Sequence, residues 1–330
     1  MFWRIEQVAK YFLGAIPSLS MPNLPLILLP DLVAFGRQSP SPPRPQLHPF
    51  RFEPLVLSCR ASDSSFNIAS ANIVTGANNL RLLLDFVFGQ ADKSFRIDME
   101  VRRGTTFMAR WESDVSNLTE TSRCRGYGRG FEVASTSSQM DLPQTSHHRI
   151  LSYNLAELKI IVQYQADACD CSCDKAWAGR GTSASTRPVT ELPITSSERL
   201  HLVAGGVSHD LSCLVEIKSR EQRNHHVHDI LPQMWLSQQS TMLMGRHSRG
   251  CFTSVDICNM AGEIREWEAQ NATKLGQFAA LLTKIHMLVS AAAEDNRSRC
   301  FSLLHYRDDD SESLRLFERE GGQAMLAPEE

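Results

Sequence analysis

The sequence has no long uninterrupted apolar segment. Its most apolar early stretch, residues 11–30, contains Pro17, Pro22, Pro25 and Pro30. A membrane-spanning helix needs ~20 consecutive apolar residues, and proline breaks a helix interior. The stretch also lacks the compact apolar region and small-residue cleavage site of a signal peptide. We therefore expect an intracellular protein, nuclear or cytoplasmic, with no signal peptide or transmembrane helix.

The chain has no surplus of positive charge. It contains 34 Lys and Arg against 37 Asp and Glu, which gives a formal net charge of -3. No global field therefore draws the protein towards nucleic acid. Any contact with RNA must come from a local group of basic side chains.

The cysteines form no recognisable framework. Nine cysteines in 330 residues is an ordinary and odd number, which disfavours a disulfide scaffold and favours a reducing compartment. Cys169, Cys171 and Cys173 alternate, whereas structural zinc sites usually place two residues between paired ligands. We expect a solvated loop there. The clustered histidines at positions 147, 148, 225, 226 and 228 are also expected to be solvated.

The composition divides the chain into two parts. Residues 1–50 are rich in proline and predict an extended arm. Residues 51–330 predict a single domain with a real hydrophobic core. Residues 168–198 are rich in Ser, Thr, Gly and Cys and predict an insertion loop inside that domain.

Apolar periodicity predicts both helices and strands. The expected helices are residues 79–88, 229–238 and 262–292. The expected strands are residues 95–101, 105–112, 149–155, 157–167, 200–207, 210–219, 241–247, 251–257, 301–306 and 313–319. Arg103-Gly104 and Arg249-Gly250 are expected turns between strands. This order predicts an α+β fold, a curved mixed central sheet flanked by helices.

Three charged residues lie at the ends of apolar strands. Asp167 ends one strand, and Glu216 and Lys218 alternate along a later one, so their side chains lie on one face. Mg²⁺ and Mn²⁺ prefer oxygen ligands and retain waters for a phosphate substrate. The lysine can orient a water or offset charge in the transition state. Alternating charge on a half-exposed strand gives the same E-x-K pattern without function, but charges ending buried strands are costly unless paired or metal-bound.

This spacing resembles that of the PD-(D/E)xK nucleases, and the order of further motifs resembles the decapping exoribonucleases of the DXO type. The matching segments span about residues 70–290. They are VTGANNL, FRIDMEV with TTFMARW, GYGRGFE, QAD, EIK and PQMW. The sequence is also similar to a group of uncharacterised fungal proteins with HHRILSY-like, EIK-like and PQ-W-SQ-like segments.

The resemblance implies roles for five residues. Glu132, Asp167 and Glu216 would bind Mg²⁺ or Mn²⁺, Lys218 would be the catalytic lysine, and Gln233 would position water or substrate. Without the resemblance, Glu132 is an ordinary carboxylate at the start of a helix and Gln233 an ordinary surface amide. The implied activity is cleavage at the 5′ end of RNA.

Two positions depart from the family pattern. Gln165 replaces the first acid of the family's E-x-D, and an amide oxygen is a weaker ligand for a divalent cation. Ala77 replaces an arginine, which removes a bidentate phosphate or cap anchor. These changes favour the alternative of a nuclease fold that binds without turnover.

Two further hypotheses concern charged groups. Arg103, Arg125 and Arg129 flank the inferred cleft and are candidate RNA contacts. The run from Asp308 to Asp310 superficially resembles the aspartate-rich motif of a prenyl-diphosphate synthase. That enzyme needs two such motifs facing an all-α cavity, whereas here a single run lies between predicted strands, so this function is disfavoured.

Overall fold

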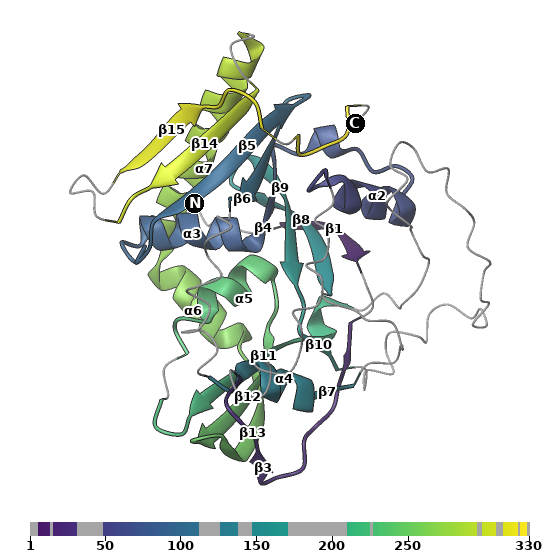
Figure 1. Cartoon of the computed structure of the whole chain (residues 1–330), viewed down its shortest axis with the longest axis vertical. Coiled ribbons are helices and arrows are strands. Elements are labelled where there is room, and N and C mark those ends of the chain that lie inside the picture. Colours follow the sequence, from purple (N-terminus) through teal and green to yellow (C-terminus); the bar gives the residue numbers. More distant parts are fainter. Residues whose placement is uncertain are drawn as a thin grey trace.

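The computed structural model (Figure 1) describes most of the chain. The described residues are 6–13, 16–31, 49–111, 126–137, 147–170, 210–224, 227–295, 299–307, 313–322 and 324–328. For residues 6–13 only the backbone is described. The structure does not describe Arg125, Cys171, Cys173, residues 225–226, the run 308–310, the expected strand 200–207 and most of the expected insertion loop.

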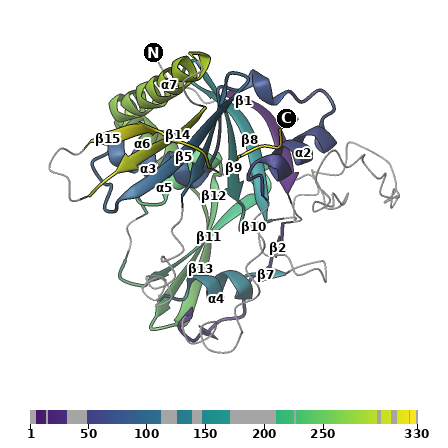
Figure 2. The ribbon, with the colours of Figure 1, turned by 45° about the horizontal axis from the view of Figure 1, so that its top comes forward.

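The described strands form two sheets (Figures 1 and 2). The first contains, in spatial order, β1 (Glu6–Leu13), β8 (His148–Leu155), β9 (Leu158–Gln165), β4 (Ile73–Gly76), β6 (Thr105–Arg110), β5 (Phe95–Arg102), β14 (Cys300–His305) and β15 (Leu314–Glu318). The second contains β3 (Leu26–Ile27), β13 (Cys251–Asn259), β12 (Thr241–Ser248), β11 (Leu214–Glu221), β10 (Ala168–Cys169), β2 (Ser18–Leu19) and β7 (Thr136–Ser137).

The sheets are mixed. Strand β4 runs parallel to both of its neighbours, β9 and β6, and β11 runs parallel to β12, while most other pairs are antiparallel. The described helices are α2 (Glu53–Ser62), α3 (Ala77–Val87), α4 (Gly128–Ala134), α5 (Leu231–Ser237), α6 (Ala261–Gln270) and α7 (Ala272–Glu294). The predicted α+β class with a mixed sheet and flanking helices is confirmed.

Both predicted tight turns are confirmed. Arg103 and Gly104 between β5 and β6 have φ values of 48° and 80°, and Arg249 and Gly250 between β12 and β13 have φ values of 50° and 86°. Two successive residues at positive φ match the right-handed twist of paired strands. These turns fix the register of the two hairpins.

The predicted single helix over residues 262–292 is wrong. Asn271 has φ -106° and ψ 13°, and it separates α6 from α7. Its side-chain Nδ2 donates to the carbonyl of Trp267 at 2.7 Å. An asparagine side chain competes for backbone groups in this way and favours helix ends over helix interiors.

The N-terminal fifty residues contribute more than an extended arm. Strand β1 pairs antiparallel with β8, from Glu6 opposite Asn154 to Leu13 opposite His148. Strands β2 and β3 extend the second sheet. Proline composition did not predict these strands, because their pairing partners lie far along the chain. The division into an arm and one domain stays a prediction.

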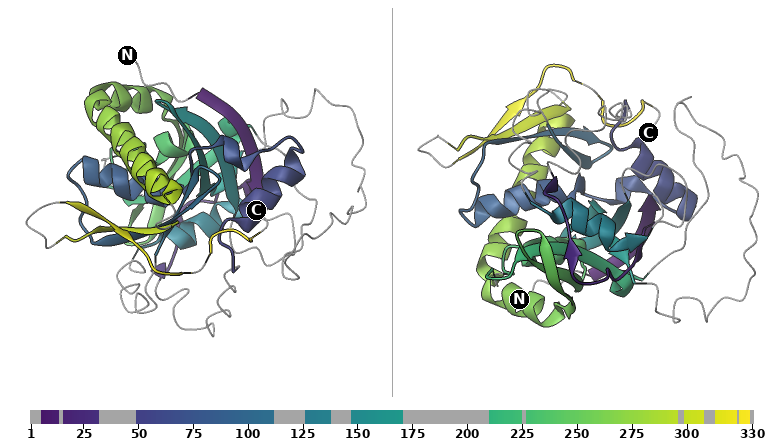
Figure 3. Two further views of the ribbon diagram at one scale, coloured as in Figure 1. Left: turned by 90° about the horizontal axis from the view of Figure 1, so that it is seen from above. Right: turned by 60° about the horizontal axis from the view of Figure 1, so that its bottom comes forward.

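Alternating side chains of the first sheet enter two cores. Ile73, Met108 and Ile160 pack on the side of α3 and α7. Val74 and Phe107 on the same strands face the other side, where they meet α2 and the C-terminal segment 325–326. Figure 3 shows α7 and α2 on either side of these strands. Helices therefore cover both faces, as period-two burial requires.

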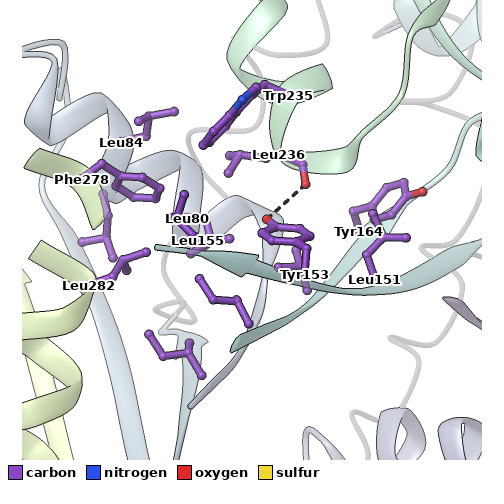
Figure 4. Packing of buried hydrophobic residues seen from close by; sticks show 14 of the residues in the cluster. Leu80, Leu84, Leu151, Tyr153, Leu155, Tyr164, Trp235, Leu236, Phe278 and Leu282 are labelled. Carbon is purple, nitrogen blue, oxygen red and sulfur yellow. Dashed lines mark hydrogen bonds between the residues drawn. The ribbon is translucent and has the colours of Figure 1, made fainter. Parts of the chain in front are cut away.

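The larger core joins both sheets through α5. Figure 4 shows Trp235 and Leu236 of α5 above Tyr153 of β8, with Leu80 of α3 and Phe278 of α7 beside them. The Tyr153 hydroxyl donates to the backbone carbonyl of Leu236 at 3.3 Å. This contact holds α5 close to the first sheet, and α5 begins at Leu231 with a proline in its first turn, as predicted.

Helix α7 has the length and apolar composition that a membrane span needs. No transmembrane helix was expected from the sequence. Of the most apolar stretch of α7, 33% is buried inside the protein. Leu275, Phe278, Leu282 and Val289 lie in the core. A core helix of a water-exposed fold meets the same criteria, so the composition of α7 is weak evidence for a membrane.

Candidate active site

A cavity of about 710 Å³ opens where three parallel strands of the first sheet end. β9, β4 and β6 are neighbours in the sheet and run in the same direction, so their carboxyl ends share one edge. Clefts outside such an edge are common ligand sites in open sheets. The predicted residues that line the cavity are Asp167, Glu216, Lys218 and Gln233.

The two carboxylates meet because the chain crosses between the sheets at Asp167. β9 ends at Gln165 in the first sheet and β10 begins at Ala168 in the second. Ala168 lies opposite Val215 in β11, so the same register carries Asp167 towards Glu216. The backbone N–H of Ile217 donates to Asp167 Oδ2 at 2.9 Å.

Glu216 has one cationic partner, Lys218, and one polar partner, Gln233. Lys218 Nζ lies 2.5 Å from Glu216 Oε1, and Gln233 Nε2 donates to the same oxygen at 2.7 Å. Glu216 is only 2% exposed. Gln233 reaches it from α5, which the contact between Tyr153 and Leu236 holds in place. The carboxylate therefore has a fixed orientation.

The charges in this cluster alter one another's ionisation. Burial and then the Glu216 charge raise the pKa of Asp167 from 3.8 to about 8, although Lys218 and the Ile217 N–H oppose the rise. Burial opposes the charged form of Lys218, but the Glu216 and Asp167 charges outweigh it and raise its pKa. Lys218 is therefore an ammonium at neutral pH.

The donor set fits a hard divalent cation. Two carboxylates that repel each other in a buried place lose that repulsion when a cation lies between them. Mg²⁺ is commonly held by one or two carboxylates, with waters and substrate phosphate completing the shell. Asp167 and Glu216 supply that number of ligands.

Glu132 occupies a different position from the other two acids. It lies half-buried on α4, which packs against β11, and it does not line the cavity. Burial raises its pKa, Lys218 lowers it and Glu216 raises it again, so its charge acts on the cluster. The described residues hold no group of three His, Cys, Asp or Glu side chains at metal-binding spacing. Its role as a third ligand stays a prediction.

The position of α4 depends on a glycine in β12. Phe131 of α4 is fully buried and stacks on Phe252, with ring centroids 4.7 Å apart. It fits because Gly245 lies beneath it, and a Cβ at Gly245 would come within 2.3 Å of the Phe131 ring. This close approach brings Glu132 next to the strand that carries Glu216.

We expect Gly245→Ala to destabilise the protein by about 1–3 kcal/mol, because the added methyl group overpacks a full core. The displaced Phe131 ring should move α4 away from β11. Chemical denaturation measures the free energy of unfolding. Gly262→Ala, at a helical position with open space around the added Cβ, is the control. Equal stability of the two variants would contradict this packing account.

The predicted RNA-binding arginines do not line the cavity within the part of the chain that is described. Arg103 lies in the turn at the opposite end of β6 from the cavity. Arg129 lies on α4, where its backbone N–H donates to Asp31 Oδ2 at 3.0 Å. Arg125 is outside the described residues. Their roles stay predictions.

Sequence reasoning missed the basic residues that do line the cavity: Arg51, Arg81 and Arg110. Arg110 ends a strand that was predicted, but its neighbour β4 has only four residues and gave no periodic signal. Arg51 precedes α2, which was not predicted. Both departures from the family pattern, Gln165 and Ala77, also line the cavity.

A family model described as a domain of unknown function (DUF8563) matches residues 42–329. The chain belongs to this family. No curated protein sequence matches this DUF8563 protein. Its two-sheet fold, in contrast, has clear counterparts among solved structures.

Three of these structures resemble the DUF8563 chain over nearly its whole length. Rai1 of Scheffersomyces stipitis, solved with (3'-NADP)+ and calcium ion, has a TM-score of 0.60 and 13% identity and covers 94% of this chain and 86% of its own. S. pombe Rai1, solved with 3'-FADP, has a TM-score of 0.57 and 14% identity, and the match covers 95% of this chain and 93% of the Rai1 chain. K. lactis Dxo1, solved with manganese, has a TM-score of 0.57 and 11% identity, and the match covers 98% of this chain and 91% of the Dxo1 chain. The predicted fold of the decapping exoribonucleases is confirmed.

Proposed function

We propose that this protein is a divalent-metal-dependent nuclease that acts at the 5′ end of RNA. The observation that carries the proposal is the meeting of Asp167 and Glu216, with Lys218 and Gln233 beside them, in one cavity at the strand ends. The fold alone would not support it, because one fold hosts many functions.

Asp167 and Glu216 would hold Mg²⁺ or Mn²⁺, with Glu132 as the third carboxylate that the resemblance implies. Such a cation polarises a phosphoryl oxygen and lowers the pKa of a bound water. The remaining chemistry belongs to side chains of this protein.

Lys218 supplies a fixed positive charge. In the metal-free protein the Glu216 and Asp167 charges raise its pKa, so it holds its proton at neutral pH. Its Nζ can stabilise negative charge that develops on the phosphoryl group. Gln233 donates from its amide Nε2 to Glu216, which would hold that carboxylate in position for the metal.

The comparisons support metal and RNA as ligands. K. lactis Dxo1 was solved with manganese. Candida albicans Rai1 was solved with pU5-Mn2+, and it resembles this chain with a TM-score of 0.56 and 13% identity. A cavity lined by carboxylates and arginines suits a metal and a polyanion together.

A second candidate function is binding without turnover. Gln165 in place of an acid favours it, as does the lack of a three-ligand group among the described residues. The retained Asp167, Glu216 and Lys218 oppose it, because they are the carboxylates and the ammonium group that metal-dependent cleavage would use.

The test is hydrolysis of 5′-labelled RNAs, one with a monophosphate and one with a cap, in Mn²⁺ and in EDTA. Glu216→Ala purified in parallel reports any contaminating nuclease, and Glu157→Gln, an exposed acid in the β8–β9 turn, is the matched control. We expect the wild type and Glu157→Gln to cleave in Mn²⁺ but not in EDTA, and we expect Glu216→Ala to cleave in neither. Intact RNA with every folded protein would overturn the nuclease and favour the binding function.

A further inference from the structure

Helix α4, which carries Glu132, begins without a cap of its own. Its N-cap residue, Tyr127, makes no side-chain cap hydrogen bond. The first four N–H groups of a helix have no partner within the helix. The helix has only seven residues, and two of them, Gly128 and Gly130, are glycines, so its intrinsic helix propensity is low. Contacts with other segments must therefore hold α4 in place.

Asp31, from the N-terminal fifty residues, supplies the missing cap. Its Oδ2 accepts from the Arg129 N–H at 3.0 Å, and its Oδ1 accepts from the Gly130 N–H at 2.9 Å. These are the second and third residues of α4, whose N–H groups an N-cap side chain normally satisfies. Asp31 is only 9% exposed, and its own N–H donates to the Gly126 carbonyl at 2.8 Å. Its carboxylate is therefore fixed against the start of the helix.

The segment that contains Asp31 is itself fixed to the second sheet. Leu26 of β3 lies opposite Phe252 of β13, and the Leu28 N–H donates to the Gly250 carbonyl at 2.9 Å. A Cβ at Gly250 would come within 2.5 Å of both the Leu28 carbonyl oxygen and the Tyr127 ring, so no spare space separates these segments. Residues 26–31 therefore clamp the start of α4 to the turn between β12 and β13.

This clamp affects the position of Glu132. Phe131, between the capped Gly130 and Glu132, is fully buried, so α4 cannot turn about its axis unless that ring leaves the core. The pKa of Glu132 responds first to burial and then to the charges of Lys218 and Glu216, which places its carboxyl group within electrostatic reach of the cluster. The cap and the buried ring together determine where this carboxyl group lies.

We propose that Asp31 is a positioning residue for the third metal ligand: by capping α4, it holds Glu132 near Asp167 and Glu216. This assignment rests on the proposed function. It gives the N-terminal segment a part in the active site that its proline-rich composition did not predict. The influence of Asp31 on the metal passes through Glu132, which distinguishes it from a general contribution to stability.

The test is a double-mutant cycle for Mn²⁺ binding, measured by calorimetry on the full chain. Asp31→Ala should raise the Kd for Mn²⁺ about tenfold in the wild-type background and less than about twofold in a Glu132→Gln background. Asp31→Asn keeps an acceptor oxygen for α4, so its Kd should stay within about threefold of the wild-type value. Asn67→Ala removes a cap elsewhere, where Asn67 Oδ1 accepts from the Ala69 N–H at 3.0 Å, and should leave the Kd unchanged.

An unchanged Kd for Asp31→Ala would overturn the positioning role. An equal rise in both backgrounds would also overturn it, because that result indicates a general loss of structure. Asp31→Glu keeps the carboxylate but misplaces it by one methylene group, so it carries the same cycle if Asp31→Ala does not fold.

Hydrogen exchange of the α4 amides in EDTA is the metal-free measurement. These amides should exchange about tenfold faster in Asp31→Ala than in the wild type or Asn67→Ala, because loss of the cap favours local opening of α4. Equal exchange would overturn the clamp whatever the metal result. A wild type that binds no Mn²⁺ but shows this difference would overturn the proposed metal site and its third ligand, and leave Asp31 as the cap of α4 alone.

Discussion

Lys218→Met should lower kcat for RNA cleavage by about 10²–10³-fold, the usual effect of losing one charge aimed at a developing anion. The methionine keeps the length of the side chain and removes the ammonium that lies 2.5 Å from Glu216 Oε1. Binding of Mn²⁺ should remain or strengthen, because a competing cation has left the carboxylate.

Single-turnover cleavage and Mn²⁺ titration measure these two effects separately. Lys284→Met, at an exposed position on α7, is the matched control and should retain the wild-type rate. A variant that keeps more than a third of the wild-type kcat would contradict the role given to Lys218. So would a wild-type rate that rises with deprotonation of a lysine, since that behaviour belongs to a general base.

Asp167→Asn should stabilise the metal-free protein at high pH and abolish its stabilisation by Mn²⁺. The folded-state pKa of Asp167 is raised from 3.8 to about 8, chiefly by burial and then by the Glu216 charge. The folded protein therefore binds this proton more tightly than the unfolded chain does. That contribution to stability is complete below pH ~4 and is lost as pH rises towards and through 8.

Asparagine does not ionise, so the variant avoids this loss, and its side-chain oxygen can still accept from the Ile217 N–H. Melting temperatures at pH 6 and pH 9, in EDTA, should fall less for Asp167→Asn than for the wild type. Mn²⁺ at 100 times its Kd should stabilise the wild type by ~2.7 kcal/mol and the variant by far less. Asp92→Asn, an exposed position, serves as control. Equal Mn²⁺ stabilisation of wild type and Asp167→Asn would contradict the assignment.

The sequence predicted the part of the site that depends on local geometry. Glu216 and Lys218 share a face because strand side chains alternate, and the structure brings them together with an ion pair. The helix that carries Gln233 was predicted from its spacing and from Pro232 in its first turn. The tight turns were predicted from arginine-glycine pairs. Each of these features spans ten residues or fewer.

The rest depends on contacts between distant segments. Asp167 meets Glu216 because β10 pairs with β11, and two residues in a strand give no periodic signal. Arg51 reaches the cavity because Phe52 packs between Phe107 and the segment that contains Met325. No local pattern encodes those partners. The break at Asn271 had a local signal, an asparagine within an apolar repeat, which the amphipathic spacing on either side concealed.

The most direct test of the account is anomalous diffraction from crystals of the full chain grown with Mn²⁺. We predict a manganese peak in the cavity, with carboxylate oxygens of Asp167 and Glu216 about 2.0–2.6 Å away, the range for hard cations. Its distance from Glu132 would decide whether that residue is the third ligand. A peak only at other sites, or no peak at saturating Mn²⁺, would contradict a metal centre formed by Asp167 and Glu216.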